Sequence, residues 1–487
     1  MSAAGEGVAL AALLARLPHA RIRGDANARI ERIATDSREA GPSALFVALE
    51  GERADGHLFV AEALANGAAA VVVDRGRARD VPDGTTVVEV ESTRRALSSL
   101  AAALYRDPSH ALTVVGVTGT NGKTTTTHMV AAIASEAGLA CGIVGTIGAS
   151  FGRRSWSLAH TTPFPNELHA ILAEMAALGA RAVAMEVSSH ALALQRVDDV
   201  RFACAALTNV TRDHLDFHGT REAYAAAKRR LFSLSARAVI NNDDAYGARW
   251  ADELREALPL QTFAIEASAD IRPNEVRTTV AGSTFTLDGR EFSLALVGRF
   301  NVANALAAIG CARAVGIADE HARDALASLR RVPGRMDRLT GSGVEVVVDY
   351  AHTPDALEHA LQALRETAAG HVAVVFGCGG DRDRGKRAEM GALAARYADR
   401  IYVTSDNPRH EDPAAIAAEI VAGIGTAPHV LELDRRTAIA RAVREAAAGD
   451  VVLVAGKGHE TYQIVGDRRL RFDDAEVAEE SLRARAR

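Results

Sequence analysis

Cysteine is scarce in this chain: four residues in 487, scattered at Cys141, Cys204, Cys311 and Cys378, with no CxxC spacing. This scarcity argues against a disulfide framework and against a structural zinc site, and buried thiols in a reducing compartment are the expected state. Aromatic residues make up only 5% of the chain. We therefore expect hydrophobic cores filled mainly by Ala, Val and Leu.

Long apolar runs and an excess of positive charge are also missing. No stretch of about 18 residues is apolar and uncharged throughout, which argues against membrane insertion. The N-terminal segment has no basic region ahead of its apolar residues, so we expect no signal peptide and a cytoplasmic protein. The net charge of −6 and the pI of about 6.3 predict no nucleic-acid partner, but they leave room for a local basic pocket.

The length predicts about three domains, which we place at residues 1–106, 107–333 and 334–487. Strand-like apolar runs alternate with helical patterns in each of them, which is typical of parallel sheets with crossover helices. The expected fold class is therefore α/β. Residues 276–297 have the pattern of a short β meander. RVPGRMDRL, at 331–339, is typical of a linker because Pro and Gly interrupt both neighbours.

The segment GVTGTNGKTT, residues 116–125, follows an apolar run and opens a helical pattern. Glycines let a backbone wrap closely around phosphate oxygens, which the loop amides and the helix N-terminus attract. Lys123 would then reach the β/γ-phosphates and Thr124 would ligate Mg²⁺. Gly116 lies six residues before Gly122 rather than five, a departure from G-x4-G-K-[ST] that makes an ordinary P-loop kinase or ATPase less favoured.

Acidic, histidine and lysine side chains follow in the same region. Glu186 ends an apolar run, where either a Mg²⁺ ligand or an ordinary strand-end glutamate is possible. The segment DHLDFH, at 213–218, places His214 and His218 four residues apart. That spacing could hold zinc, but an adjacent glycine and the lack of a third ligand favour Mg²⁺ or a solvated loop. Lys228, taken alone, is typical of a surface lysine on a helix.

Eleven segments occur in one order along the chain: GTNGKTT, TTP, EVSSHAL, TNVTRDHLDFHG, AAK, GRFNVANALAA, VPGRMD, DYAHTPDAL, GCGGDRDRGKR, DNPR and GKGHE. In this order they resemble the Mur ligase family, and within it the UDP-N-acetylmuramoyl-tripeptide synthetases of peptidoglycan synthesis. The resemblance covers nearly the whole chain. It implies an N-terminal α/β uridine-binding domain, a central ATPase domain with a P-loop-type parallel sheet, and a C-terminal Rossmann-like domain that binds an amino acid.

The resemblance also implies which residues bind each ligand. The ATP contacts would be Gly119, Thr120, Asn121, Gly122, Lys123, Thr124, Thr125, Asn301, Arg335 and Asp349. The contacts to UDP-N-acetylmuramoyl-L-alanyl-D-glutamate would be Thr35, Ser37, Glu52, Arg53, Ala54, Thr161, Thr162, Ser188, Arg196 and Lys228. The metal set would be Thr124, Glu186, His214 and Lys228, the last as a carbamate. Lys123, Glu186, His214 and Lys228 would be the catalytic residues.

The implied reaction is amide ligation driven by ATP and Mg²⁺. The γ-phosphoryl group would pass to the D-Glu carboxylate, and the amine of meso-2,6-diaminopimelate would attack the resulting acyl phosphate in a monomeric enzyme. The resemblance assigns diaminopimelate to Arg382, Asp406, Asn407, Pro408, Arg409, Gly456 and Glu460. A guanidinium at Arg409 could clamp the distal carboxylate of diaminopimelate, whereas it would repel the ammonium of L-lysine.

Three other functions remain open at this stage. A lysine-adding member of the family would lack the arginine of DNPR, and a folylpolyglutamate synthetase-like ligase would have no reason for a uridine-binding segment. A P-loop kinase or regulatory ATPase explains residues 116–130 alone. Phosphate release that depends on an amine distinguishes a ligase from a kinase, because a kinase leaves the phosphate on its product.

Overall fold

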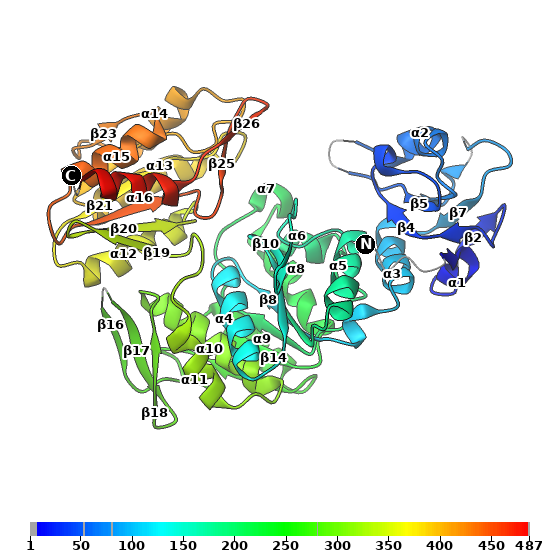
Figure 1. Ribbon diagram of the computed structural model, residues 1–487, viewed down its shortest axis with the longest axis horizontal. Helices are drawn as coiled ribbons and strands as arrows, with labels where there is room; N and C mark the ends of the chain where they lie inside the picture. The colour runs from blue at the N-terminus through cyan, green and yellow to red at the C-terminus, as the bar shows by residue number, and fades with distance from the viewer. Residues whose placement is uncertain (1–6, 52–53, 79–80, 280, 486–487) are drawn as a thin grey trace. The chain divides into compact units, whose positions relative to one another are not determined.

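The computed structural model describes residues 7–51, 54–78, 81–279 and 281–485. Three α/β regions follow one another along the chain, each built on its own sheet (Figure 1). By compactness the chain divides into two units: Met1–Thr118 with Gly138–Ala206 and Ala226–Ala238, and Gly119–Ala137 with Leu207–Ala225 and Val239–Arg487.

The N-terminal region contains a five-stranded sheet. In spatial order its strands are β2 (Arg21–Arg23), β7 (Val87–Val90), β6 (Ala70–Asp74), β5 (Ala44–Val47) and β4 (Arg32–Ala34). The last four pair in parallel, and β2 is antiparallel to β7. The helices are α1 (Leu10–Leu14), α2 (Val60–Ala65) and α3 (Thr93–Leu104), and a small ladder joins β1 (Val8–Ala9) to β3 (Arg29–Ile30).

Both faces of this sheet are buried, as the continuous apolar run of β6 predicts for a parallel strand. Successive side chains of a strand point to opposite faces. Val72 accordingly packs with Leu97 of α3, while Val71 and Val73 pack on the other face with Ala63 of α2.

The central region contains an eight-stranded sheet. In spatial order its strands are β11 (Arg154–Trp156), β10 (Gly148–Phe151), β9 (Cys141–Gly145), β12 (Ala182–Glu186), β8 (Thr113–Thr118), β13 (Cys204–Leu207), β14 (Ala238–Asn241) and β15 (Leu260–Phe263). The strands β9, β12 and β8 are parallel, as predicted. The strand β10 is antiparallel to both of its neighbours, β9 and the edge strand β11. Only two residues separate it from each of them, and a parallel crossover needs many more.

Helices and one small sheet complete the central region. The helices are α4 (Lys123–Glu136), α5 (Pro165–Ala177), α6 (Ser189–Ala193), α7 (Leu215–His218), α8 (Arg221–Ser233), α9 (Ala245–Leu254), α10 (Arg299–Ala314) and α11 (Asp319–Ser328). The predicted meander is confirmed as an antiparallel sheet of β16 (Val276–Thr279), β17 (Gly282–Leu287) and β18 (Arg290–Leu294).

The C-terminal region contains a six-stranded sheet. In spatial order its strands are β19 (Asp337–Gly341), β20 (Val344–Asp349), β24 (Val451–Ala455), β21 (Val372–Phe376), β22 (Arg400–Val403) and β23 (Val430–Leu431). All neighbours are parallel except β19 and β20. Its helices are α12 (Pro354–Thr367), α13 (Gly385–Tyr397), α14 (Pro413–Ile424), α15 (Arg435–Glu445) and α16 (Asp474–Arg485), and β25 (Tyr462–Val465) forms a hairpin with β26 (Arg468–Arg471).

The predicted linker at 331–339 is partly wrong. Its last three residues belong to β19, which turns back onto β20 through Ser342 and Gly343. Both turn residues have positive φ, 52° and 75°, and this conformation matches the twist of a two-residue hairpin. The domain boundaries themselves stay predictions.

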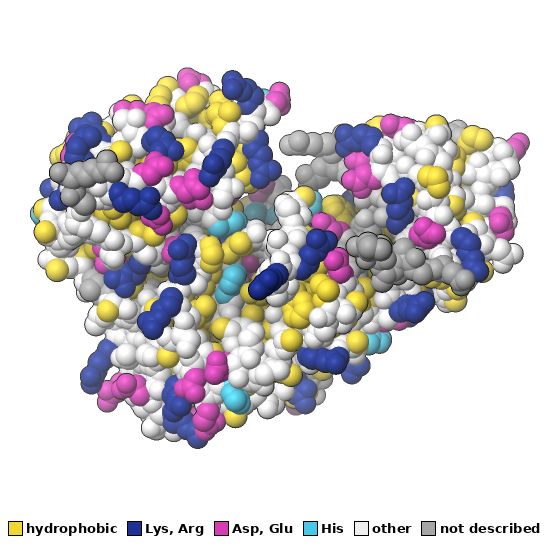
Figure 2. Space-filling model, in the orientation of Figure 1, with side chains coloured by type: hydrophobic (Ala, Val, Ile, Leu, Met, Phe, Trp, Pro, Cys, Tyr) yellow, Lys and Arg dark blue, Asp and Glu magenta, His cyan; other side chains and the backbone are white. Residues whose placement is uncertain are grey.

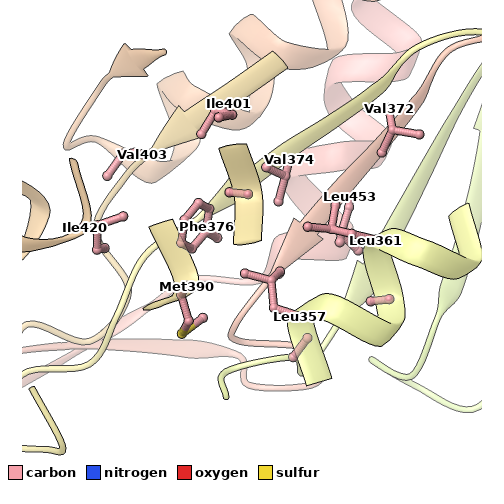
Figure 3. Packing of buried hydrophobic residues seen from close by; sticks show 14 of the residues in the cluster. Leu357, Leu361, Val372, Val374, Phe376, Met390, Ile401, Val403, Ile420 and Leu453 are labelled. Carbon is pink, nitrogen blue, oxygen red and sulfur yellow. The ribbon is translucent and has the colours of Figure 1, made fainter. Parts of the chain in front are cut away.

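Two hydrophobic layers cover the C-terminal sheet. Figure 3 shows Val374 and Phe376 of β21 packed with Leu361 of α12 and Met390 of α13. The alternate residue Val375 faces the other way and packs with Ile439 of α15. Because helices cover both faces, loops at the carboxyl ends of the strands are left to form a site.

The four cysteines are thiols, as predicted, and Cys204, Cys311 and Cys378 are buried, whereas Cys141 is half-buried. No helix among the described residues has both the length and the apolar character needed to cross a bilayer. On the face drawn in Figure 2, basic and acidic side chains are interspersed among the described residues.

Candidate active site

The segment between β8 and α4 forms the predicted glycine-rich loop. Gly119 and Gly122 have φ values of 149° and 85°, which residues with side chains rarely adopt. A Cβ atom on Gly119 would overlap Thr208, and one on Gly122 would overlap Asn304, so both positions require glycine. The helix begins at Lys123, and its first amides have no partner within the helix. The loop can therefore offer N–H groups to an anion.

Lys123 folds over this loop. Its Nζ donates hydrogen bonds to the carbonyl oxygens of Gly119 and Thr120, both at 2.8 Å. The ammonium is thus held against the loop whose shape the glycines set. This is a suitable position for a charge that meets phosphate oxygens.

Three side chains that the sequence reasoning missed brace the loop. Thr208 donates to the carbonyl of Asn121 at 2.5 Å, and the Asn209 side chain accepts from the Asn121 amide at 2.9 Å. The hydroxyl groups of Tyr224 and Thr120 lie 3.1 Å apart. Thr208 and Asn209 directly follow the apolar run of β13, and polar residues at that strand end were the available signal.

Two predicted nucleotide contacts come from the start of the C-terminal region. Arg335 donates from Nη2 to the Thr124 hydroxyl at 2.9 Å. The carboxylate of Asp349 accepts from the amides of Met336 at 2.7 Å and Ala351 at 2.8 Å. Burial raises the pKa of Asp349. The structure therefore brings Arg335 to the phosphate loop, with Asp349 fixing the backbone beside that arginine.

Asn301 is buried behind the loop. Its side chain donates to the carbonyl of Val297 at 2.8 Å and accepts from Asn304 at 3.1 Å. Asn304 in turn lies against Gly122 and accepts from Thr126 at 3.4 Å. Asn301 thus connects to the phosphate loop through Asn304, and a direct contact of Asn301 with the nucleotide stays a prediction.

Glu186 ends β12, where it pairs in register with Val117 of the strand that leads into the phosphate loop. Its carboxylate is buried and accepts from the amide of Thr146 at 2.8 Å and from the Thr146 hydroxyl at 2.9 Å. The Thr146 hydroxyl also lies 3.1 Å from that of Thr161. A carboxylate held in this way keeps further lone pairs for a cation.

The predicted dipeptide contacts gather around the same strand end. The Thr162 hydroxyl donates to the Glu186 carbonyl at 2.9 Å and accepts from the Ser188 amide at 3.0 Å. Arg196 donates to the Thr162 carbonyl at 2.9 Å, and its guanidinium lies 4.1 Å over the ring of Phe164. Burial lowers the pKa of Arg196 to about 10, so this arginine stays cationic at neutral pH.

His214 and Lys228 lie on successive segments after β13. His214 has a φ of 51°, and its ring approaches the Asp213 carboxylate at 3.3 Å. Burial opposes ionisation of Asp213, but the charges of His214, His352 and Lys123 lower its pKa. Lys228 is 1% exposed on α8, so the interpretation of Lys228 as a surface lysine is wrong.

The oxygen donors available suit Mg²⁺. Thr124 offers a hydroxyl and Glu186 a carboxylate, the hard ligands that this ion prefers. Within the described residues, no three His, Cys, Asp or Glu side chains gather as a metal centre. Mg²⁺ usually takes one or two protein oxygens and completes its shell with phosphates and water. Taken by itself, each residue is of a type that can ligate a phosphate-bound Mg²⁺.

The predicted uridine diphosphate contacts lie in the N-terminal region. Thr35 follows β4 and is half-buried, and Ser37 is buried and donates to Glu62 at 2.7 Å. Ala54 is exposed. Residues 52–53, also predicted as contacts, lie outside the described residues. The role of all these residues in binding uridine diphosphate stays a prediction.

A polar cluster forms where β22 and β24 end at the same edge of the C-terminal sheet. The Asn407 amide donates to Glu460 at 2.8 Å. Lys457, which the sequence reasoning missed, is fully buried and donates to Asn407 at 3.0 Å and to Glu460 at 3.2 Å. Gly456, with a φ of 117°, leaves room for the carboxylate of Asp406. The structure therefore brings together four of the residues predicted to bind diaminopimelate.

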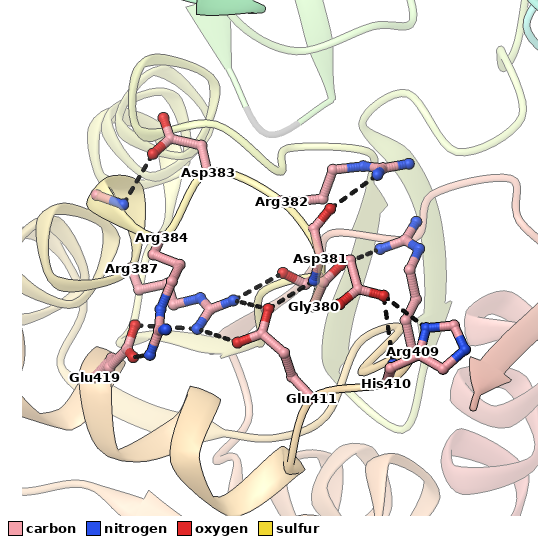
Figure 4. A network of polar contacts seen from close by, with 12 residues as sticks. Gly380, Asp381, Arg382, Asp383, Arg384, Arg387, Arg409, His410, Glu411 and Glu419 are labelled. Atoms are coloured by element: carbon pink, nitrogen blue, oxygen red, sulfur yellow. Dashed lines mark hydrogen bonds and ion pairs between the residues drawn. The ribbon is translucent and has the colours of Figure 1, made fainter. Parts of the chain in front are cut away.

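Arg409 and Arg382 extend this cluster. Arg409 follows the buried Pro408 and donates from Nη1 to the Gly380 carbonyl at 2.8 Å, while Arg382 donates to the Asp381 carbonyl at 2.9 Å (Figure 4). Burial, and then the charge of Arg382, lower the pKa of Arg409. Two guanidinium groups close enough to repel each other could together bind a carboxylate, and this role stays a prediction.

The chain is similar to known proteins over nearly its whole length. Three family models match the chain in sequence: Mur ligase family, catalytic domain, over residues 29–105; Mur ligase middle domain over 117–312; and Mur ligase, glutamate ligase domain, over 334–458. A protein of Gloeobacter violaceus is 47% identical over 467 residues, 94% of each chain. The chain belongs to the Mur ligase family.

Several relatives of this chain share one ligase name. The Gloeobacter protein is named UDP-N-acetylmuramoyl-L-alanyl-D-glutamate–2,6-diaminopimelate ligase, as is a Geobacillus thermodenitrificans protein that is 43% identical and covers 98% of this chain and 99% of its own. A solved structure of a ligase with that name aligns with a TM-score of 0.69 at 33% identity, over 99% of this chain and all of that one. The three-domain fold of the Mur ligases, predicted from the sequence, is therefore confirmed.

Proposed function

We propose that this Mur ligase joins an amino group of meso-2,6-diaminopimelate to the D-Glu carboxylate of UDP-N-acetylmuramoyl-L-alanyl-D-glutamate, with ATP hydrolysed to ADP and phosphate. The names of relatives that are 43–47% identical over nearly the full length support this substrate pair. The reaction would take place in the cytoplasm, where ATP is available. A monomeric state and the absence of a nucleic-acid partner stay predictions.

The observation that carries the proposal is the charge arrangement at the carboxyl edge of the C-terminal sheet. Arg382 and Arg409 present two guanidinium groups, and Asp406 and Glu460 lie in the adjoining cluster. A diaminopimelate molecule carries a carboxylate and an ammonium at its distal end. The guanidinium groups match the carboxylate and the acidic residues match the ammonium.

The chemistry requires activation, because a carboxylate and an amine do not condense in water. A carboxylate oxygen attacks the γ-phosphorus of ATP, the bond to ADP breaks, and an acyl phosphate forms. The amine then attacks the carbonyl carbon, gives up a proton, and phosphate leaves. The contribution of the protein is positioning and charge stabilisation rather than covalent catalysis.

Residues of this chain supply both effects. Lys123 and the loop amides between Gly119 and Thr125 would neutralise phosphate oxygens that otherwise repel the attacking carboxylate. Thr124 and Glu186 would hold Mg²⁺, which supplies further charge neutralisation when bound. Lys228 would contribute as a carbamate, formed when its neutral amine adds to the carbon of CO2 and releases a proton, because the buried side chain would then present oxygen ligands in place of a cation.

The proposal is tested by phosphate release with ATP, Mg²⁺ and the UDP-linked dipeptide, with and without diaminopimelate. We expect release only when both substrates are present, together with ADP and an amide-linked product identified by mass spectrometry. Release without the amine, or a phosphorylated product that accumulates, would instead indicate an ATPase or a kinase. Leaving out the UDP-linked dipeptide is the matched control.

A further inference from the structure

An ion pair between a buried arginine and a partly exposed glutamate lies beside the loop that carries Arg382. Arg387 of α13 is 0% exposed and donates from Nη2 to Glu411 Oε1 at 2.8 Å and from Nη1 to Glu411 Oε2 at 3.0 Å. The same Nη1 reaches Glu419 of α14 at 3.0 Å. Figure 4 shows Glu411 between Arg387 of α13 and Asp381, in the loop that also carries Arg382.

Glu411 also binds the backbone of that loop. Its Oε1 accepts from the Asp381 amide at 2.6 Å. The carbonyl of the same peptide group, that of Gly380, accepts from Arg409 Nη1 at 2.8 Å. One peptide plane is therefore held at both ends, by Glu411 through its N–H and by Arg409 through its oxygen. A rotation of this peptide would break both hydrogen bonds.

The surrounding backbone needs such support. Asp381 and Arg409 both have a φ of 52°, a conformation that costs energy for a residue with a side chain and persists only where neighbours enforce it. Gly380 donates its own amide to the Asn407 carbonyl at 2.9 Å. The pKa of Glu411 is lowered to about 2, first by the hydrogen bond from Arg387 and then by that from the Asp381 amide, so this carboxylate stays ionised.

We infer that Glu411, held by Arg387, is a positioning residue that orients the 380–381 peptide and thereby directs the Arg409 guanidinium toward the carboxylate of the incoming amino acid. The inference rests on the proposed function for the identity of that substrate. Glu411 touches no substrate in this account. It acts through the loop, and its effect falls on amino-acid affinity and selectivity rather than on ATP use.

Glu419 provides the matched control. Like Glu411 it pairs with the Arg387 guanidinium, and it also pairs with Arg384. Within the described part of the chain, the Glu419 carboxylate bonds to these two arginines and not to the 380–381 peptide. If the carboxylates served only to neutralise buried Arg387, loss of either one would leave the other to pair with it and would not free the 380–381 peptide. Of the two carboxylates, only Glu411 accepts a hydrogen bond from the 380–381 peptide.

The test compares Glu411→Ala, Glu411→Gln and Glu419→Ala in phosphate-release assays with varied diaminopimelate. For Glu411→Ala we expect the KM for diaminopimelate to rise about tenfold to a hundredfold, with the KM for ATP unchanged and the preference over L-lysine reduced. Glu411→Gln keeps one carbonyl acceptor, so its effect is intermediate. Glu419→Ala stays within about twofold of the unsubstituted protein in the KM for diaminopimelate.

Hydrogen–deuterium exchange of the peptide containing residues 377–385 gives a readout that needs no activity. Faster exchange at the Asp381 amide in Glu411→Ala, but not in Glu419→Ala, supports the positioning role even if the unsubstituted protein proves not to use diaminopimelate. Equal effects of the two alanine variants on exchange and KM would overturn the inference. So would faster exchange in Glu411→Ala with an unchanged KM for diaminopimelate, since the peptide would then not direct Arg409.

Discussion

The side-chain amide of Asn121 donates a 2.6 Å hydrogen bond to the carboxylate of Asp355. The same carboxylate oxygen accepts from the Thr211 hydroxyl at 3.2 Å. Asp355 lies in the first turn of α12, whereas Asn121 belongs to the phosphate loop and Thr211 to the segment that follows β13. The Asp355 side chain, from the C-terminal region, therefore joins the phosphate loop to the segment after β13 in the central region.

Replacing Asp355 with alanine should weaken the binding of ATP. The loss of two hydrogen bonds frees the Asn121 side chain, so we expect the KM for ATP to rise about tenfold, the equivalent of about 1.4 kcal/mol. Asp355→Asn keeps one acceptor oxygen and should have a smaller effect. Phosphate release at varied ATP concentration measures both variants. An unchanged KM for ATP in the alanine variant would show that this contact is not needed for nucleotide binding.

The ion pair between Arg435 and Asp474 should contribute more to the free energy of unfolding than an exposed ion pair between the same helices, α15 and α16. Both side chains are 0% exposed, and they share hydrogen bonds of 2.7 and 2.6 Å. Asp474→Asn leaves a buried guanidinium without its counter-charge and should cost about 3–5 kcal/mol. The exposed pair of Arg436 and Glu480 joins the same two helices, so Glu480→Gln is the matched control and should cost less than about 1 kcal/mol. Urea unfolding measures both, and equal shifts would contradict this account.

His169 should make the protein sensitive to acid. Its ring is 0% exposed on α5, and neither ring nitrogen has a hydrogen-bond partner among the described residues. Burial lowers its pKa from 6.5 to about 4. The unfolded chain therefore binds a proton first as the pH falls, and stability present above pH 6.5 is lost progressively down to about pH 4, by about 3 kcal/mol in full.

His169→Leu removes this proton uptake. Thermal unfolding of both proteins at pH 7.5 and pH 5 should show a smaller acid-induced drop for the leucine variant. Parallel curves for the two proteins would mean that His169 is not protonated during acid unfolding.

Lys228→Ala should abolish ligation. The buried lysine would act as a carbamate, so its loss removes oxygen ligands and should lower kcat about a hundredfold or more. Acetate or formate added to the variant should restore part of the activity, because a small carboxylate can occupy the vacated space. The unsubstituted enzyme with the same salts is the control. Full activity of the variant, or no response to either salt, would contradict the carbamate role.

The fold was largely predictable because many of its strands consist of continuous apolar residues. VVLVA and VAVVF can be buried only in a sheet covered on both faces, and they became β24 and β21. The pattern failed where a strand is short and polar. Asp337–Gly341 contains two charged residues, and its strand character comes from the turn at Ser342 and Gly343 rather than from its own composition.

The sequence predicted which types of residue form the site, but it did not predict which side chains they contact. The glycines of the phosphate loop and the arginine of DNPR were recognisable from sequence. Lys457 and Asp355 were not, because a lysine or an aspartate in a polar segment is usually exposed. Only the fold shows that Lys457 is buried between Asn407 and Glu460. Long-range pairing of this kind carries no signal in local composition.

This ligase is expected to add diaminopimelate rather than L-lysine. Phosphate release should be measured with ATP, Mg²⁺ and UDP-N-acetylmuramoyl-L-alanyl-D-glutamate, with the two amino acids in parallel. We predict a kcat/KM for meso-diaminopimelate at least about a hundredfold above that for L-lysine, because the ammonium of lysine would face Arg382 and Arg409. An equal or higher value for L-lysine would keep the ligase but contradict the role assigned to the two arginines.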